Sequence, residues 1–191
     1  AVQQVSKELV GMLEIDSVLR IILKKLVKGL GYKLSGLQLF DKNDGKLKYR
    51  AVSLLPGLQK FVETAAGISV YDIKLDIKDP EDKKNLATKV FMEKKIITSE
   101  NLHDFTRPIL KNKQAQLLKK AFGLERTIGI PLILGGNTIG VLEVIGSSRV
   151  LTESEKKVLT TFANQISIAI YNSQLYERVN NFNKQLKQKV S

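Results

Sequence analysis

Residues 127–170 read TIGIPLILGGNTIGVLEVIGSSRVLTESEKKVLTTFANQISIAI and decide the fold of this chain. Two apolar runs, IGIPLIL and TIGVLEVI, flank the sequence Gly135-Gly136-Asn137. Glycine and asparagine accept positive φ at little cost, so the two runs predict a β-hairpin. Both faces of each predicted strand are largely apolar, which indicates a sheet that is covered on both sides. Pro131 donates no ladder hydrogen bond and must therefore lie where the strand needs no partner.

A helix is expected directly after this hairpin. Thr152 and Glu155 have the spacing of a capping box, in which a threonine and a glutamate three residues later satisfy free N–H groups at the start of a helix. The apolar residues that follow are mostly three or four positions apart, which predicts an amphipathic helix lying across the sheet. These residues are Leu159, Phe162, Ala163, Ile166 and Ile170, and we expect Phe162 and Ile166 to be buried against the sheet.

This succession resembles the C-terminal half of a GAF domain, in which G-V-L, a short loop and F-T-x-x-D-E lead into the last helix. The corresponding residues are Gly140-Val141-Leu142 and the run LTESEK at 151–156. The resemblance extends over nearly the whole chain and implies an α+β fold. In that fold, long N- and C-terminal helices lie on one face of a central antiparallel sheet and a helical insert lies on the other. A PAS-like sheet domain is the competing fold, and the long capped helix after a large helical insert favours GAF.

The rest of the chain supplies the other elements of an α+β sheet domain. We expect a helix at 2–28 that ends at Gly29 and Gly31, strands at 34–41 and 46–54, a helix at 58–66 and a strand-like segment at 68–73. We then expect an exposed loop at 74–85, a helix at 86–95, a short strand at 96–100, a loop at 101–108 and a helix at 112–122.

The composition limits the class of protein. With 191 residues, of which 43% are hydrophobic, the chain is long enough for one domain with a sizeable core. It contains no cysteine, which excludes disulfides, thiolate metal sites and cysteine chemistry. No apolar run approaches the ~20 residues of a membrane span, and no signal-peptide pattern is present. We expect a cytoplasmic domain, and because the chain begins at Ala1 and ends within a helical pattern, a fragment of a longer protein.

The net charge of +12 raises the alternative of a basic nucleic-acid-binding domain. The cations are mostly lysines scattered along every predicted element, whereas arginine, the residue that most often reads bases, occurs at six positions. Dispersed lysine is typical of a solvated surface. A continuous lysine stripe on one face would instead favour the nucleic-acid alternative.

Enzyme chemistry finds little support in the sequence. His103 is the only imidazole, so sites that need two histidines are excluded within one chain. His103 and Asp104 could form an orienting pair, but no nucleophile elbow, Walker loop or dinucleotide fingerprint accompanies them. GAF relatives that reduce free methionine sulfoxide need cysteines, and bilin-binding relatives need a cysteine or a characteristic histidine motif. We therefore expect no enzyme activity, no catalytic residues and no metal, and we assign no cofactor.

The resemblance implies a small-molecule site between one sheet face and the helical insert. Phe91 and Phe105 could stack a ring, and Arg107 could pair with an anionic group. The alternative is that Phe91 is ordinary core and Arg107 ordinary surface. The candidate ligand-binding residues are Phe91, His103, Asp104, Phe105, Arg107 and Thr127.

The sequence lacks most of the signature of cyclic-nucleotide-binding GAF domains. Members that bind these ligands carry an N-K…F…D-E signature, and a carboxylate is kept only at the position of Glu155. The residues at its positions here are Gly146, Ser147, Leu151, Glu155 and Lys156.

Both ends of the chain carry heptad-like apolar spacing, which predicts a parallel homodimer. We expect a coiled-coil segment at 1–14, a GAF-like sensor domain at 15–171 and a coiled-coil linker helix at 172–191. Asn172 is a candidate for the polar residue that sets the register. The predicted interface consists of Val5, Leu9, Met12, Ile168, Asn172, Leu175, Val179, Phe182 and Leu186.

Together these features predict a sensory or regulatory domain of a signal-transduction protein, such as a histidine kinase or a transcriptional regulator. It would bind an unidentified small molecule and pass the signal through its terminal helices to a downstream effector domain. No specific nucleic acid is expected as a partner. A dimerisation spacer without a ligand is the alternative within the same class, and a collapsed cavity would support it.

Overall fold

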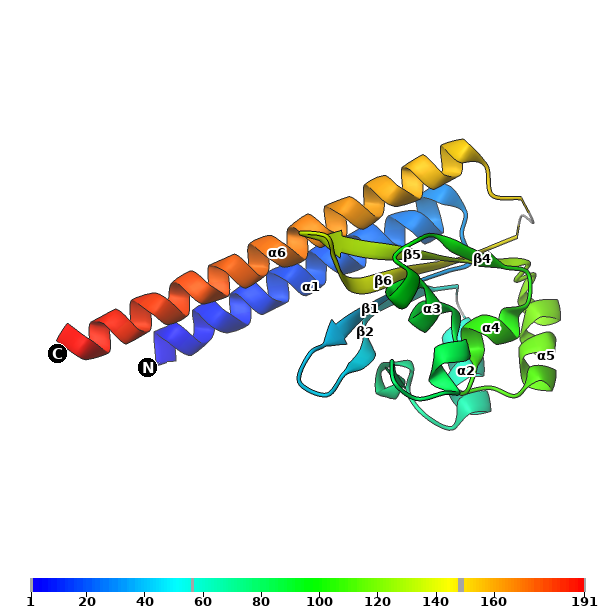
Figure 1. The fold of residues 1–191 in the computed structure, drawn as a ribbon, viewed down its shortest axis with the longest axis horizontal. Helices are drawn as coiled ribbons and strands as arrows, with labels where there is room; N and C mark the ends of the chain where they lie inside the picture. The colour runs from blue at the N-terminus through cyan, green and yellow to red at the C-terminus, as the bar shows by residue number, and fades with distance from the viewer. Residues whose placement is uncertain (1, 56, 148–149, 191) are drawn as a thin grey trace.

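Two long helices lie side by side and project beyond a rounded body of strands and short helices (Figure 1). They are α1 (Val2–Leu30) and α6 (Glu153–Val190). The computed structural model describes residues 2–55, 57–147 and 150–190, and from residue 15 onward it describes their side chains except at 187, 189 and 190. Asp16 and Ser17, which are good cap residues, do not interrupt α1.

Within the described residues, six strands form one antiparallel sheet in the order β3-β2-β1-β6-β5-β4. The two central strands, β1 and β6, come from opposite halves of the chain. The predicted strands at 34–41 and 46–54 and the predicted hairpin are confirmed. The bounds are β1 (Leu34–Asp41), β2 (Lys46–Leu54), β3 (Lys74–Asp76), β4 (Ile97–Ser99), β5 (Arg126–Leu134) and β6 (Asn137–Gly146).

The terminal helices cover one face of the sheet, and this layer holds the largest apolar core. Burial of apolar surface between the two layers is the main force that holds them together. A buried hydrogen bond of 2.9 Å from Ser35 Oγ to the carbonyl oxygen of Leu23 ties β1 to α1 as well. The buried residues of this core include Leu19, Leu23 and Leu26 of α1, Leu37, Ile128, Ile130, Leu142 and Val144 of the sheet, and Leu159, Ala163, Ile166 and Ile170 of α6.

The helical insert covers the opposite face. It contains α2 (Leu58–Ala66), η1 (Val70–Asp72), η2 (Asp82–Lys84), α3 (Leu86–Glu93), α4 (Leu102–Thr106) and α5 (Asn112–Phe122), where η denotes a 3-10 turn. Helix α3 packs closely on β5 at Gly129, because a Cβ there would lie 2.6 Å from side-chain carbons of both Leu86 and Val90. The α+β architecture predicted from the sequence, with terminal helices on one face and an insert on the other, is confirmed.

The stretch at 127–170 has the structure that its sequence predicts. Gly135 and Gly136 have positive φ angles of 56° and 77°, as the hairpin turn requires. Strand β4 pairs with β5 only from residue 127 to 129, so Pro131 lies where β5 has a single neighbour. The capping box is formed: Glu155 N donates to Thr152 Oγ1 at 3.2 Å, and Thr152 N donates to Glu155 Oε2 at 3.4 Å.

Two predicted segments are wrong because local turns and caps decide their structure. Residues 68–73 are not a strand, since Ser69 Oγ accepts the N–H of Tyr71 and starts the turn η1. The edge strand β3 forms instead at 74–76, inside the predicted loop, where Leu75 is buried opposite Leu47. Residues 101–108 are not a plain loop either, because the Asn101 side chain caps α4.

One burial prediction needs correction. Ile166 is fully buried, as expected, but Phe162 is only partly buried at the margin of the core. The positions of α6 that face the sheet directly are Leu159, Ala163, Ile166 and Ile170. Phe162 is next to Ala163 in sequence and therefore points about 100° away from it on the helix.

Candidate functional site

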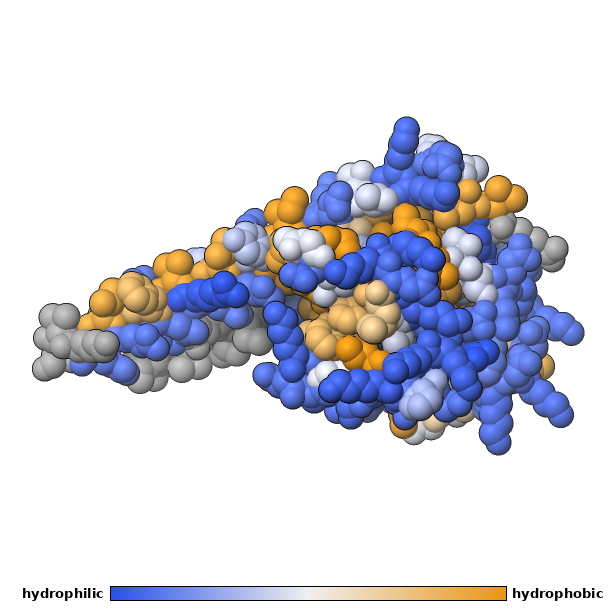
Figure 2. Space-filling model, viewed as in Figure 1, coloured by the Kyte–Doolittle hydropathy of each residue, from blue (hydrophilic) through white to orange (hydrophobic). Residues whose placement is uncertain are grey.

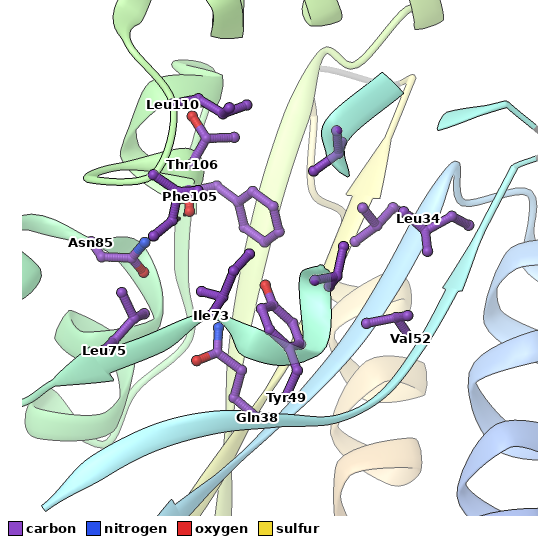
Figure 3. A pocket seen from close by; sticks show the side chains of 14 residues that line it. Leu34, Gln38, Tyr49, Val52, Ile73, Leu75, Asn85, Phe105, Thr106 and Leu110 are labelled. Carbon is purple, nitrogen blue, oxygen red and sulfur yellow. Dashed lines mark hydrogen bonds between the residues drawn. The ribbon is translucent and has the colours of Figure 1, made fainter. Parts of the chain in front are cut away.

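A cavity of about 60 Å³ lies between the sheet and the helical insert. Its walls come from β1 and β2 on one side and from the segments around η1, α3 and α4 on the other (Figure 3). This is the layer in which the sequence predicts a ligand. The lining residues are mainly apolar: Leu34, Gln38, Tyr49, Val52, Leu54, Val62, Val70, Ile73, Leu75, Asn85, Phe105, Thr106, Ile109 and Leu110.

The sheet end of this cavity is polar. Gln38 on β1 and Tyr49 on β2 both line the cavity, and both hold the buried Glu143 of β6. Gln38 Nε2 and the Tyr49 hydroxyl each donate a hydrogen bond of 2.9 Å to Glu143 Oε2. Tyr49 of β2 reaches across β1 to Glu143 of β6 because the position between these two residues is Gly36. A Cβ at Gly36 would lie 2.9 Å from the tyrosine ring. We call Gln38, Tyr49 and Glu143 the polar trio.

The carboxyl group of this trio is electrostatically unusual. Burial raises the pKa of Glu143 from 4.5 to about 7, although the hydrogen bonds from Gln38 and Tyr49 favour the ionised form and oppose the rise. Burial and the neighbouring Glu143 also raise the pKa of Tyr49, so this phenol stays protonated and remains a donor. Two acceptors of the trio, Glu143 Oε1 and Gln38 Oε1, are buried and lack a hydrogen-bond partner.

Asn85 also lines the cavity, but its side chain is fully used by the fold. Its Oδ1 accepts the N–H of Ala87 at the start of α3. Its Nδ2 donates to the carbonyl oxygens of Phe105 and Arg107, at 2.8 and 2.6 Å. Asn85 therefore fixes α4 against α3 and shapes the cavity wall, with no side-chain group left over for a ligand.

Of the six ligand-binding residues predicted from the sequence, Phe105 lines this cavity. Its ring points from α4 into the space above Gln38 and Tyr49 (Figure 3). Phe91 does not line the cavity: it packs on Phe40, with ring centroids 4.6 Å apart, in the apolar cluster under α3. Thr127 is buried within β5 and is also not a lining residue.

The remaining predicted residues form a group at α4 outside the cavity lining. Asp104 accepts a hydrogen bond of 2.7 Å from Ser99 Oγ and pairs with Arg107 at 3.2 Å. These contacts tie α4 to the end of β4. His103 lies on the same short helix and is half-buried. For these residues, and for Phe91 and Thr127, ligand contact stays a prediction.

Sequence reasoning missed the polar trio, although a signal was present. Glu143 is the single charged residue in the run TIGVLEVI, where both neighbouring positions on the same face, Val141 and Ile145, are apolar. An acid in a strand with two covered faces must be buried, and buried charges are rare unless they are paired. The partners could not be predicted, because Gln38 and Tyr49 are more than ninety positions away.

Glu155 has a second role that the capping box does not predict. Its Oε1 accepts hydrogen bonds from the Tyr32 hydroxyl at 2.6 Å and from Arg126 at 2.8 Å. Arg126 is buried at the start of β5, so this ion pair joins the sheet to the first turn of α6. Here the carboxylate that the cyclic-nucleotide signature would tie to asparagine and lysine binds an arginine and a tyrosine.

A stripe of exposed apolar residues runs along α6, from the turn that packs on the sheet at Ile166 and Ile170 toward the end of the helix. Ile168, Val179 and Phe182 are 58%, 57% and 61% exposed, which is unusual for large apolar side chains. The helical stalk in Figure 2 shows hydrophobic atoms along its upper edge. The stripe, which we call the α6 stripe, consists of Ile168, Leu175, Val179, Phe182 and Leu186, with the exposed Asn172 among them. The side chains of Val5, Leu9 and Met12 lie outside the described residues.

Two other site types find no support among the described residues. No three acidic or histidine side chains gather there in a way that could hold a metal ion. None of the helices in the same residues is both long and apolar enough to cross a bilayer.

This chain is similar to one known family in sequence and to several solved structures in fold. The sequence pattern of the GAF domain matches residues 13–170. Among proteins of curated function, no match was found. Similar solved structures include residues 122 to 287 of a methyl-accepting chemotaxis protein, with 21% identity, 85% of this chain and 92% of that chain covered, and a TM-score of 0.61.

Two further solved structures cover nearly all of their own chains. The GAF domain of a phosphoenolpyruvate-protein phosphotransferase from Coxiella burnetii has 16% identity, 93% and 96% coverage of the two chains, and a TM-score of 0.62. A type II free methionine-R-sulfoxide reductase from Thermoplasma acidophilum has 13% identity, 85% and 96% coverage, and a TM-score of 0.57. At these identities the likeness concerns the fold.

Proposed function

This chain belongs to the GAF domain family, and from that premise we propose that it is a sensory or regulatory domain that binds a small molecule. The ligand would occupy the cavity between the sheet and the insert. The terminal helices would join two copies of the chain and pass the signal to a downstream effector in a histidine kinase or a transcriptional regulator. This role would place the domain in the cytoplasm.

The observation that supports this proposal best is that β1 contributes side chains both to the cavity and to the layer of terminal helices. Leu34 and Gln38 of this strand line the cavity, whereas Ser35 and Leu37, on the opposite face, contact the layer of terminal helices. A ligand that moves β1 therefore acts on α1 through a single strand. Such a ligand changes the output only if it binds two arrangements of the helices with different affinity.

The domain boundaries follow from the same proposal. Residues 15–171 form the sensor domain, while 1–14 and 172–191 extend from it as helical connections. The α6 stripe lies mainly on the second of these connections. A dimer joined there would hold two C-terminal helices together and deliver both to the same partner.

Catalysis is not part of the proposal. The reductase from Thermoplasma acidophilum shares the fold, but the chain described here contains no cysteine for redox chemistry. Specific nucleic-acid binding is not proposed either. Of the basic residues, Lys48, Arg50, Lys84, Lys95, Arg107, Lys119, Arg126 and Lys156 are engaged in ion pairs with acids of the same chain.

A thermal-shift screen of a metabolite panel tests the ligand proposal. Val52 lines the cavity, so Val52→Phe would fill it from the β2 side. Val158→Phe makes the same change on α6 away from the cavity and serves as the matched control. We expect at least one small molecule to raise the melting temperature of the wild type and of Val158→Phe, because a ligand that binds only the folded state stabilises it.

The same molecule should have no effect on Val52→Phe. A hit that stabilises Val52→Phe as strongly as the wild type would bind elsewhere and would contradict the assignment of the cavity. A panel that yields no hit at all would favour the dimerisation spacer without a ligand.

A further inference from the structure

The carboxylate of the polar trio has no cationic partner among the described residues. Glu143 is fully buried, yet its two hydrogen-bond partners, Gln38 and Tyr49, are uncharged. Within the described residues no ion pair involves this carboxylate, although buried carboxylates are normally paired with a cation. The neighbouring positions on β1 and β5, Gly36 and Gly129, have no side chain that could supply one.

The unpaired hydrogen-bond acceptors of the trio also indicate a ligand that donates hydrogen bonds. Glu143 Oε1 and Gln38 Oε1 are both acceptors, both buried and both without a donor among the described residues. Gln38 itself lines the cavity and is almost completely buried. A ligand group that donates more than one hydrogen bond would satisfy both acceptors at once. An ammonium group carries three N–H donors and one positive charge, and it satisfies both requirements.

The rest of the cavity limits what can be attached to that group. Apart from Asn85, Thr106 and the trio residues Gln38 and Tyr49, the lining is aliphatic or aromatic. The Asn85 side chain is already used by the fold, and Thr106 Oγ1 donates to the carbonyl oxygen of Leu102. The cavity volume of about 60 Å³ is far below the roughly 300–1,000 Å³ of pockets for drug-sized ligands, so the ligand body must be short and apolar.

We propose that the cavity binds a small primary amine in its protonated form, with the ammonium group at Gln38, which lines the cavity and holds the Glu143 carboxylate, and with the apolar body against Phe105 and the surrounding aliphatic side chains. This inference rests on the proposed function and names the class of ligand. Burial raises the pKa of Glu143 to about 7, and a bound cation would favour its ionised form.

Three matched probes test the proposal: butylamine, n-butanol and butanoate, which share one apolar body and differ in the polar end. At a pH of about 8 the amine is protonated, as lysine is, and most of Glu143 is ionised. Each probe is titrated into the full chain, and binding is followed by the amide NMR signals of residues that line the cavity. We expect butylamine to bind about tenfold or more tightly than n-butanol, the gain of a charge-assisted hydrogen bond, and butanoate to bind least.

Glu143→Gln should reduce butylamine affinity to about that of n-butanol. Glu93→Gln removes one exposed acid elsewhere and should leave both affinities unchanged. If Glu143→Gln fails to fold, Gln38→Met removes the acceptor that lines the cavity and should weaken butylamine in the same direction.

The outcomes separate the two levels of the proposal. Equal binding of butylamine and n-butanol, or a preference for amine that survives both Glu143→Gln and Gln38→Met, would overturn the ammonium site and leave the ligand cavity standing. A failure of all three probes to shift any cavity signal would count against the cavity as a ligand site and therefore against both.

Discussion

Individual residues decide where polarity enters an otherwise apolar layer. Gly36 has no side chain, so the Tyr49 side chain can cross β1 at this position and contact Glu143. Gly129 does the same on β5 and lets α3 pack against the sheet. Between these two glycines, Glu143 is held in place but not neutralised. Burial of this carboxylate destabilises the folded state, and the free energy of unfolding should therefore depend on pH.

We expect the free energy of unfolding to fall as the pH rises from 4.5 to about 7, because of Glu143. The folded pKa is raised, so in this window the native state binds more protons than the unfolded chain, and stability decreases with pH. The full loss is roughly 3 kcal/mol, since one pKa unit corresponds to about 1.4 kcal/mol. Urea unfolding of the wild type and of Glu143→Gln between these pH values measures it as the difference between the two curves.

Glu143→Gln cannot ionise at this position and should lack that decrease. Glu93→Gln, which changes an exposed acid, should keep the wild-type pH profile. Parallel curves for the wild type and Glu143→Gln would show that the carboxyl group titrates as it does in the unfolded chain.

At the scale of elements, the sequence predicts well where a repeating pattern sets the structure. The strands at 34–41 and 46–54, the helix at 58–66 and the capped start of α6 follow from alternation, apolar spacing and capping residues. The short insert elements follow from individual side-chain bonds instead. Ser69 starts η1, Asn101 starts α4 and Asn85 starts α3, and only Asn85 directly precedes a helix that the sequence predicts, at 86–95.

The site was less predictable than the fold for the same reason. The family resemblance predicts a site between the insert and the sheet, and Phe105 lines a cavity there, while its contact with a ligand stays a prediction. The trio required knowledge of register, because Gln38 and Glu143 come together only once β1 and β6 are paired. Phe91 is a candidate from the family resemblance; it packs on Phe40 and does not line the cavity, so its contact with a ligand stays a prediction.

The packing of α6 on the sheet provides a test at this scale. Ile166→Ala should lower the free energy of unfolding by about 2–5 kcal/mol, as expected for a fully buried aliphatic side chain that leaves a cavity. Ile21→Ala makes the same change at an exposed position of α1 and should stay within about 0.5 kcal/mol. Chemical denaturation of both variants measures the difference. Equal effects would mean that α6 does not pack on the sheet as described.

At the scale of the whole molecule, the sheet separates a cavity from a pair of helices. In the proposed function, a ligand acts on the insert side and a partner chain on the helix side, and β1 links the two because it contributes side chains to both layers. The α6 stripe is an apolar surface that a single chain leaves exposed among the described residues. Apolar surface of this extent normally marks an interface. A parallel dimer along α6 would cover the stripe and place Asn172 where it could set the register.

Sedimentation of the wild type and of Leu175→Glu/Val179→Glu over a range of concentrations tests this account most directly. In a parallel dimer, the two glutamates of one α6 helix would lie opposite the same glutamates of the other and repel them. The sheet core, including Ile166, is unchanged in this variant. We expect the wild type to sediment as a dimer and the double variant as a folded monomer. A wild type that stays monomeric at high micromolar concentration would contradict the dimer and, with it, the route from the cavity through α1 and α6 to an effector.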